Sequence, residues 1–230
     1  MKKATLILTA ILLTGSAVFG QTDDFFIGTA VSVHNEIYLE RASDGFEIYE
    51  KNTSAQHLSV GVRMQKKLKD DWGLNFGLNY LNRQYESIVS YNHCYFSGGL
   101  CDQVLRYLDK YGYKTIEIPL GINKYLVTKE KWEFYFNVNA VTAYDVHSFY
   151  DPRFQETETI TQNRINFSSS SLTSSAGLTY NLTNKLKINF EPFIRLIHLQ
   201  RIDPVLRHNY ENKWTHFDNF GGHFLLLYRL

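Results

Sequence analysis

Residue types that can carry out hydrolysis lie together in the stretch YDVHSFYD, residues 144–151. Asp145, His147 and Ser148 are the types from which an orienting carboxylate, a general base and a nucleophile are built. All three fall at one end of a predicted strand, and no His is spaced from a second His or a Cys as zinc ligands are. We therefore predict no catalytic residue, no metal site and no cofactor, and we keep an enzyme as the alternative.

The two cysteines, Cys94 and Cys101, flank the short segment YFSGGL. In an exported protein such a pair meets an oxidising compartment, where disulfides form and persist. We predict a Cys94–Cys101 disulfide that stiffens a surface loop. Two free thiols are the alternative.

The first twenty residues have the composition of a secretory signal peptide. Lys2 and Lys3 precede a short apolar segment, residues 6–13, and the small-residue stretch SAVFG follows. We predict cleavage after Gly20, which leaves residues 21–230 as one domain. No later stretch is apolar over the ~20 residues that a membrane-spanning helix needs, so only a closed β-barrel would let the mature chain span a membrane.

The composition favours an all-β domain. The 230 residues include 16 Tyr and 16 Phe but only four Pro, and aromatic side chains fit the pleated surface of a sheet. The formal net charge of +1 gives no reason to expect a nucleic-acid partner.

The stretch DDWGLNFGLNY, residues 70–80, alternates between large apolar residues and Gly or Asn. Successive side chains of a strand point to opposite faces, so this strand has one apolar and one small polar face. Similar runs give eight predicted strands, near residues 25–33, 58–65, 72–80, 116–123, 132–140, 171–182, 186–196 and 217–230. Runs of about 9–14 residues are long enough for a tilted strand to cross a bilayer.

The connections between these strands alternate between short and long. Those at 69–71, 128–131 and 183–185 span a few residues, whereas those at 34–53, 86–112, 145–166 and 200–216 span about twenty or more. This order puts all short turns at one end of the sheet and all long loops at the other. The predicted fold is an eight-stranded antiparallel up-and-down transmembrane β-barrel with short periplasmic turns and long extracellular loops.

The polar faces decide which side of the barrel meets lipid. A soluble lipocalin-like barrel has an apolar interior, and an outer-membrane barrel has the reverse. Residues 73–79 and 171–181 carry no Lys, Arg, Asp or Glu, which suits a crowded interior better than a solvated exterior. We predict that the apolar face touches lipid, and a soluble ligand carrier is the alternative.

On the other predicted strands, the face assigned to the interior carries charged residues of both signs. We predict that they form a lumen polar network of paired charges that plugs the barrel: Arg63, Glu117, Glu133, Glu191, Arg195 and Arg229. A narrow pore lined by the same residues is the alternative. Because aromatic residues gather at membrane–water interfaces, we also predict a membrane-interface girdle of Trp72, Tyr80, Trp132, Tyr180 and Tyr228.

The segment IEIPLGINKYL, residues 116–126, resembles the EIPLLLKY stretch of the PorT-like outer-membrane β-barrel family, and a short charged turn and an aromatic strand follow in both. Strand number and loop asymmetry are also similar to OmpX and the OmpA barrel. The resemblance spans residues 21–230 and implies an architecture, not an activity. Gly121 and Asn123 stand where bulkier residues are usual, and Leu230 replaces the usual C-terminal aromatic residue. PorT itself is associated with a protein-secretion apparatus.

These features together predict a non-enzymatic envelope protein in the outer membrane of a Gram-negative bacterium. Its expected partners are the lipid bilayer, the barrel-insertion machinery during biogenesis, and an extracellular or envelope protein bound by exposed loops rich in Tyr, Asn and His. Shielding of the surface is an alternative role for these loops. We expect a monomer. An outer-membrane acyltransferase or protease, and a small channel, are the alternative functions.

Overall fold

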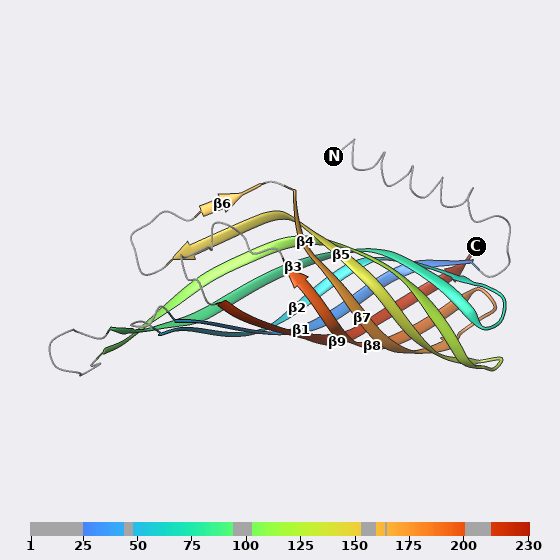
Figure 1. Cartoon of the computed structure of the whole chain (residues 1–230). Helices are drawn as coiled ribbons and strands as arrows, with labels where there is room; N and C mark the ends of the chain where they lie inside the picture. The colour runs from blue at the N-terminus through green and yellow to red at the C-terminus, as the bar shows by residue number, and fades with distance from the viewer. Residues whose placement is uncertain (1–24, 44–47, 94–102, 153–159, 164, 201–212) are drawn as a thin grey trace.

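The computed structural model describes residues 25–43, 48–93, 103–152, 160–163, 165–200 and 213–230 (Figure 1). The predicted signal peptide, residues 1–20, lies outside these ranges. The described residues form eight long strands and one short strand: β1 (Phe25–Ser43), β2 (Ile48–Lys67), β3 (Trp72–His93), β4 (Gln103–Thr128), β5 (Trp132–Pro152), β6 (Ile160–Gln162), β7 (Asn166–Asn181), β8 (Leu186–Gln200) and β9 (Lys213–Arg229).

The eight long strands close into an antiparallel barrel. Neighbours along the chain are neighbours in the sheet, β1 pairs with β9, and β4 pairs with β5. The short β6 pairs only with residues 148–150 of β5. This arrangement confirms the predicted eight-stranded up-and-down barrel. No helix among the described residues is long and apolar enough to cross a membrane.

The register fixes how the strands are staggered. A row of paired residues that starts at Phe25 of β1 goes once round the barrel and returns to β1 at Asn35, ten residues further on, through Lys66, Leu74, Ile122, Val138, Ser174, Ile194 and Phe220. Such a stagger over eight strands corresponds to a strand tilt of about 40° and an interior just wide enough to be filled by side chains.

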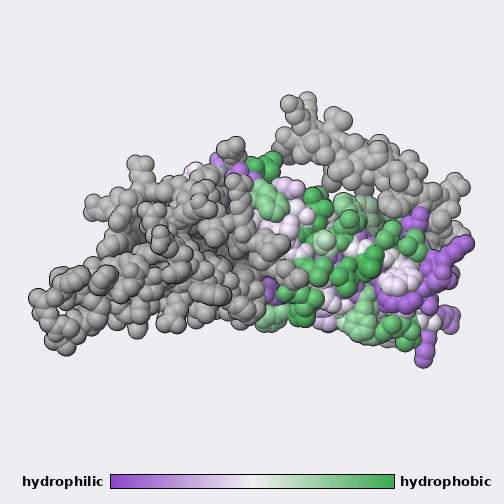
Figure 2. Space-filling model, viewed as in Figure 1, coloured by the Kyte–Doolittle hydropathy of each residue, from purple (hydrophilic) through white to green (hydrophobic). Residues whose placement is uncertain are grey.

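The apolar face points outward, as predicted. Trp72 and Tyr80 are exposed, whereas Asn75 and Asn79 between them are buried. Figure 2 shows the part of this apolar belt that lies on the visible face of the barrel. Three apolar residues stand at positions that the alternation assigns to the inward, mostly polar face: Leu81, Val141 and Phe193. All three are buried in the interior, so the alternation of inward and outward side chains continues through them.

Several strands continue well beyond the belt, and β9 pairs with β1 as far as Ala42. β1 pairs with β2 as far as Ser43 and Ile48, and β3 pairs with β4 as far as His93 and Gln103. The predicted loops at 34–53, 86–112 and 145–166 were therefore too long, because much of each is paired strand. Outside the hydrocarbon both faces of a strand meet water or polar groups, so backbone pairing persists where apolar alternation fades.

The connection from β2 to β3 is as tight as a hairpin allows. Asp70 and Asp71 have φ values of 59° and 61°, and the N–H of Trp72 donates to the carbonyl of Lys69 at 3.3 Å. Two successive positive φ values define a type I′ turn, whose twist matches that of the flanking strands. At the turn after β7, the hydroxyl of Thr183 accepts bonds from the N–H groups of Lys185 and Leu186.

Candidate functional site

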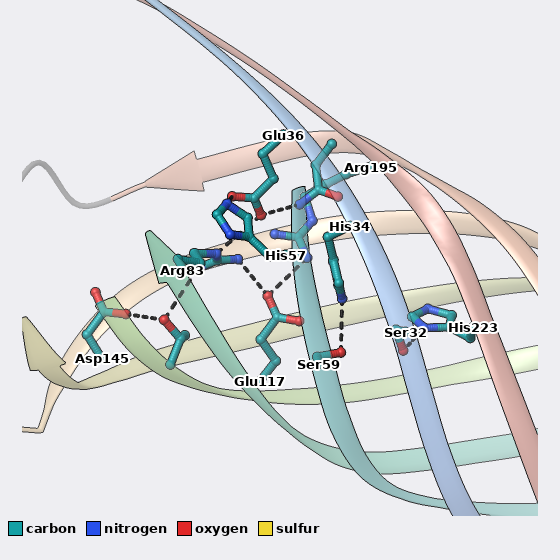
Figure 3. A network of polar contacts seen from close by, with 12 residues as sticks. Ser32, His34, Glu36, His57, Ser59, Arg83, Glu117, Asp145, Arg195 and His223 are labelled. Atoms are coloured by element: carbon teal, nitrogen blue, oxygen red, sulfur yellow. Dashed lines mark hydrogen bonds and ion pairs between the residues drawn. The ribbon is translucent and has the colours of Figure 1, made fainter. Parts of the chain in front are cut away.

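Glu117 of β4 lies at the centre of a buried ion cluster in the barrel interior (Figure 3). Its Oε1 accepts a bond from Arg83 Nη2 of β3 at 2.9 Å and one from Arg195 Nη2 of β8 at 3.1 Å. Glu117 is 2% exposed. The two contacts tie strands that lie on different sides of the lumen.

Glu36 of β1 completes this cluster. It accepts a bond from Arg83 Nε at 3.2 Å and from Asn219 Nδ2 at 2.7 Å, and its other oxygen lies 3.5 Å from His57 Nε2. We refer to Glu36, Arg83, Glu117 and Arg195 as the outer ion cluster. Its two carboxylates and two guanidinium groups balance, as buried charges must.

His34, which lies beside the outer ion cluster in Figure 3, belongs to a layer of aromatic rings that continues to His223. The Phe193 ring stacks on His223, with centroids 4.4 Å apart, and meets His34 edge-on at 5.2 Å. His34 Nε2 lies 3.1 Å from the hydroxyl of Ser59, and His223 Nδ1 bonds to the hydroxyl of Ser32. All five side chains are buried in the barrel interior.

A third layer is centred on Tyr135. Its hydroxyl donates to Glu191 and accepts from Asn189, and Asn189 also donates to Glu191 Oε1 at 3.0 Å. The ring rests on Gly177, where an added Cβ would overlap it. Glycine is needed here because a large ring approaches the backbone closely.

The remaining interior Arg has an amide partner. Arg63 Nη1 donates to Asn75 Oδ1 at 3.5 Å, and Asn75 in turn donates to Asn123 at 2.9 Å. The guanidinium lies over Gly77, where a Cβ would be 3.3 Å from Arg63 Nε. Small residues on one wall thus leave room for large polar side chains from the other.

The short-turn end of the lumen holds one acid between two lysines. Glu133 Oε1 accepts bonds from Lys67 at 2.8 Å and Lys187 at 3.1 Å. Each ammonium group also lies over an aromatic ring, Lys67 over Tyr125 at 4.5 Å and Lys187 over Phe26 at 4.1 Å. Ion pairs and cation–π contacts therefore both hold the two lysines at the short-turn end of the lumen.

Some interior polar atoms have no protein partner among the described residues. They include both side-chain amide atoms of Asn137 and Nη1 of Arg195. Because buried polar groups are almost always hydrogen-bonded, we expect ordered water at these points.

The six residues predicted for the lumen network lie in different layers. Glu117 and Arg195 contact each other, whereas Glu133, Glu191 and Arg63 have Lys, Tyr and Asn partners. Arg229 is half-buried at the end of β9, where its N–H donates to the carbonyl of Lys185. The sequence reasoning missed several interior residues that share the same parity: His34, Glu36, His57, Lys67, Arg83 and Lys187.

The five predicted girdle residues lie at two levels. Trp72 and Trp132 begin β3 and β5, and the Trp132 ring lies 4.5 Å from that of Tyr180. Tyr228 lies at the same end, near the end of β9. Tyr80 lies eight residues along β3 from Trp72, toward the other edge of the belt.

The candidate hydrolase residues do not form a relay. Asp145 accepts a bond from the hydroxyl of Thr115 at 2.7 Å, and His147 Nδ1 lies 2.6 Å from Asn163 Oδ1. No group of three or more His, Cys, Asp or Glu in the described ranges could hold a metal ion. Cys94 and Cys101 lie outside the described residues.

Comparisons with known proteins agree with this architecture. Residues 19–198 match the family described as outer membrane protein beta-barrel domain. A comparison with curated proteins found no match.

Several solved structures resemble the chain over most of its length. The outer membrane protein OprG from Pseudomonas aeruginosa has 13% identity and a TM-score of 0.50, over 91% of this chain and 96% of that chain. Ail of Yersinia pestis, in complex with the heparin analogue sucrose octasulfate, has 13% identity and a TM-score of 0.43, over 90% and 99%. The outer membrane protease OmpT from Escherichia coli has 9% identity and a TM-score of 0.49, over 91% and 98%. At these identities the likeness to OprG concerns the fold alone. Because the family match covers most of its length, the chain belongs to the outer membrane protein beta-barrel domain family and is an outer-membrane β-barrel.

Proposed function

We propose that the protein is a non-enzymatic, non-conducting barrel of the cell envelope that binds a partner through the sheet it extends outside the membrane. The observation that carries the non-conducting part is the outer ion cluster. A continuous pore would have to separate Glu117 from two arginines inside the lumen. Unpaired buried charges cost several kcal/mol, which opposes such an opening.

In planar bilayers we expect no steady open-channel conductance from the folded protein, because the outer ion cluster and the rings of His34, Phe193 and His223 occupy the interior. Heat-modifiable gel migration of the same preparation provides the control for correct folding. Steady, voltage-independent single-channel steps from a folded sample would refute the closed lumen and favour the small channel.

The binding part of the proposal rests on the strand extensions. Outward-facing residues of β2 change from apolar to polar at Gln56, whose amide donates to Asn35 of β1 at 2.9 Å. From this pair to the pair of Ser43 and Ile48, the two strands continue in register for about 26 Å at ~3.3 Å per residue. An ordered sheet beyond the membrane offers a partner a preformed surface and lowers the entropy lost on binding.

Replacing residues 87–109 by a two-residue Asn-Gly turn tests this function. The change trims the β3–β4 extension beyond the pair of Glu86 and Lys110 and leaves the belt intact. We expect unchanged outer-membrane fractionation and heat-modifiable migration, but at least tenfold weaker binding to any ligand that the intact barrel retains on arrays of extracellular proteins and glycans. Equal array binding by intact and trimmed barrels would contradict a binding role for this extension and favour surface shielding.

We also propose PorT-like membership within the wider family. The supporting observation is the segment 116–126, which forms part of β4. An enzyme has less support than a binding protein, because Asp145 and His147 do not bond to each other. Asp145 bonds to Thr115, and His147 bonds to Asn163.

A further inference from the structure

Lys124 is an outward-facing cation within an apolar stretch of β4. The outward residues on either side of it along the strand are Ile122, 48% exposed, and Leu126, 53% exposed. Its partners across the two ladders are aromatic, Trp72 of β3 and Phe136 of β5. A charged side chain is costly within the hydrocarbon but not at its edge, so the position of the ammonium group decides what Lys124 can do.

The ammonium group of Lys124 extends toward the short-turn end. Nζ donates a hydrogen bond to the carbonyl of Asp70 at 3.0 Å and lies 5.0 Å from the centre of the Trp72 ring. The stem therefore covers apolar surface while the charge reaches the rim of the belt, as lysines do at membrane interfaces. This level, beside a Trp, is where lipid headgroups lie.

A second lysine faces outward on the adjacent strand. Lys66 of β2 is paired with Leu74, which follows Trp72 on the same face of β3. Lys66 and Lys124 thus flank Trp72, and the exposed side chains of Leu74 and Ile122 continue from them into the belt. Cations above an apolar strip match an anionic phospholipid, with its phosphate at the lysines and its acyl chains on the strip.

Among the described residues, the short-turn end is basic, although the chain is almost neutral. Nine basic and four acidic residues of the described ranges lie on its turns and strand ends: Lys66, Lys67, Lys69, Lys124, Lys129, Lys131, Lys185, Lys187 and Arg229, with Asp70, Asp71, Glu130 and Glu133. Figure 2 shows a hydrophilic rim beyond the apolar belt at this end. Such a rim attracts anionic lipid over a distance of about a Debye length.

We propose that Lys66, Trp72 and Lys124 form a binding site for the headgroup of an anionic phospholipid in the leaflet at the short-turn end. The ligand is a lipid and not a free phosphate, because Leu74 and Ile122 have contacts to offer only to attached acyl chains. The inference rests on membrane insertion alone, and neither the closed lumen nor partner binding outside the membrane is needed for it.

Native mass spectrometry of the folded, detergent-solubilised full-length chain tests the site. Phosphatidylglycerol, phosphatidylcholine and glycerol phosphate are added in separate titrations and in competition. We expect phosphatidylglycerol to be retained about tenfold more tightly than phosphatidylcholine, and glycerol phosphate not to displace it. Lys66→Gln combined with Lys124→Gln should weaken phosphatidylglycerol binding about 30-fold, since each lysine near a membrane surface contributes roughly fivefold.

Lys114→Gln is the matched control. Lys114 is exposed on the same outward face of β4, but it lies at the opposite edge of the belt, where its ladder partners are Asn82 of β3 and His147 of β5. The affinity of the Lys114→Gln variant for phosphatidylglycerol should stay within twofold of wild type. The double variant Lys66→Arg with Lys124→Arg keeps both charges and should retain binding. Equal retention of both lipids by wild type, undiminished binding by the double Gln variant, or displacement by glycerol phosphate would overturn the site. A normal heat shift in that case would leave the proposed function standing.

Discussion

Glu117→Gln should lower the free energy of unfolding by about 3–5 kcal/mol, the usual effect of removing one partner from a buried ion pair. The substitution keeps the shape of the side chain but leaves Arg83 and Arg195 facing a neutral amide. Arg83 retains Glu36, whereas Arg195 loses its carboxylate. Unfolding by denaturant in lipid vesicles, followed by Trp fluorescence, measures the change.

Glu130→Gln at the exposed turn between β4 and β5 is the matched control, and it should change stability by no more than about 0.5 kcal/mol. Adding Arg195→Gln to Glu117→Gln should cost much less than the sum of the two single changes, because the pair acts as one unit. If Glu117→Gln proved as mild as Glu130→Gln, the outer ion cluster would not hold the barrel closed.

The membrane-spanning part of the fold could be predicted because lipid leaves the sequence few options. Every outward side chain within the hydrocarbon has to be apolar and every inward one has to fit a narrow lumen, so parity is sharp at residues such as Phe76 and Asn75. The short turns follow the same logic. Asp70 and Asp71 fall where the chain must reverse within two residues.

The interior residues Glu36 and Arg83 were missed because the predicted strands ended with the apolar belt. Arg83 follows Asn79 and Leu81 at intervals of two, and Glu36 follows His34, so extending the parity past the belt would have placed all of them inside. Beyond the hydrocarbon, however, outward residues such as Asn82 are polar as well, and the contrast that marks the two faces is lost.

The pairing of lumen charges could not be predicted from parity. Parity assigns a face, whereas the level of a residue along the barrel axis depends on the stagger between strands. The ten-residue stagger brings Arg195 to Glu117 and leaves Glu191 with Tyr135 instead. A one-residue slip between strands would turn these side chains to the lipid face, and a two-residue slip would change their partners.

Val138→Arg should destabilise the folded barrel by about 2–4 kcal/mol, the cost of an arginine on the lipid-facing side near the middle of the bilayer. Val138 lies midway along the outward face of β5 within the belt, and it is 42% exposed in the isolated barrel. Burial of Asn137 and Asn139 on either side of it leaves no inward route for the new charge. Denaturant unfolding in vesicles of defined thickness gives the free energy.

Thr128→Arg provides the comparison, because Thr128 is exposed at the short-turn end of β4, where the same charge should cost only about 0–1 kcal/mol. The difference between the two variants should shrink in thinner bilayers, since a shorter path lets the Val138→Arg guanidinium reach the headgroups. Equal stabilities for the two variants in every bilayer would mean that water reaches Val138. The apolar belt would then be a solvated surface, and the lipid-facing assignment of Phe136 and Trp132 would fail with it.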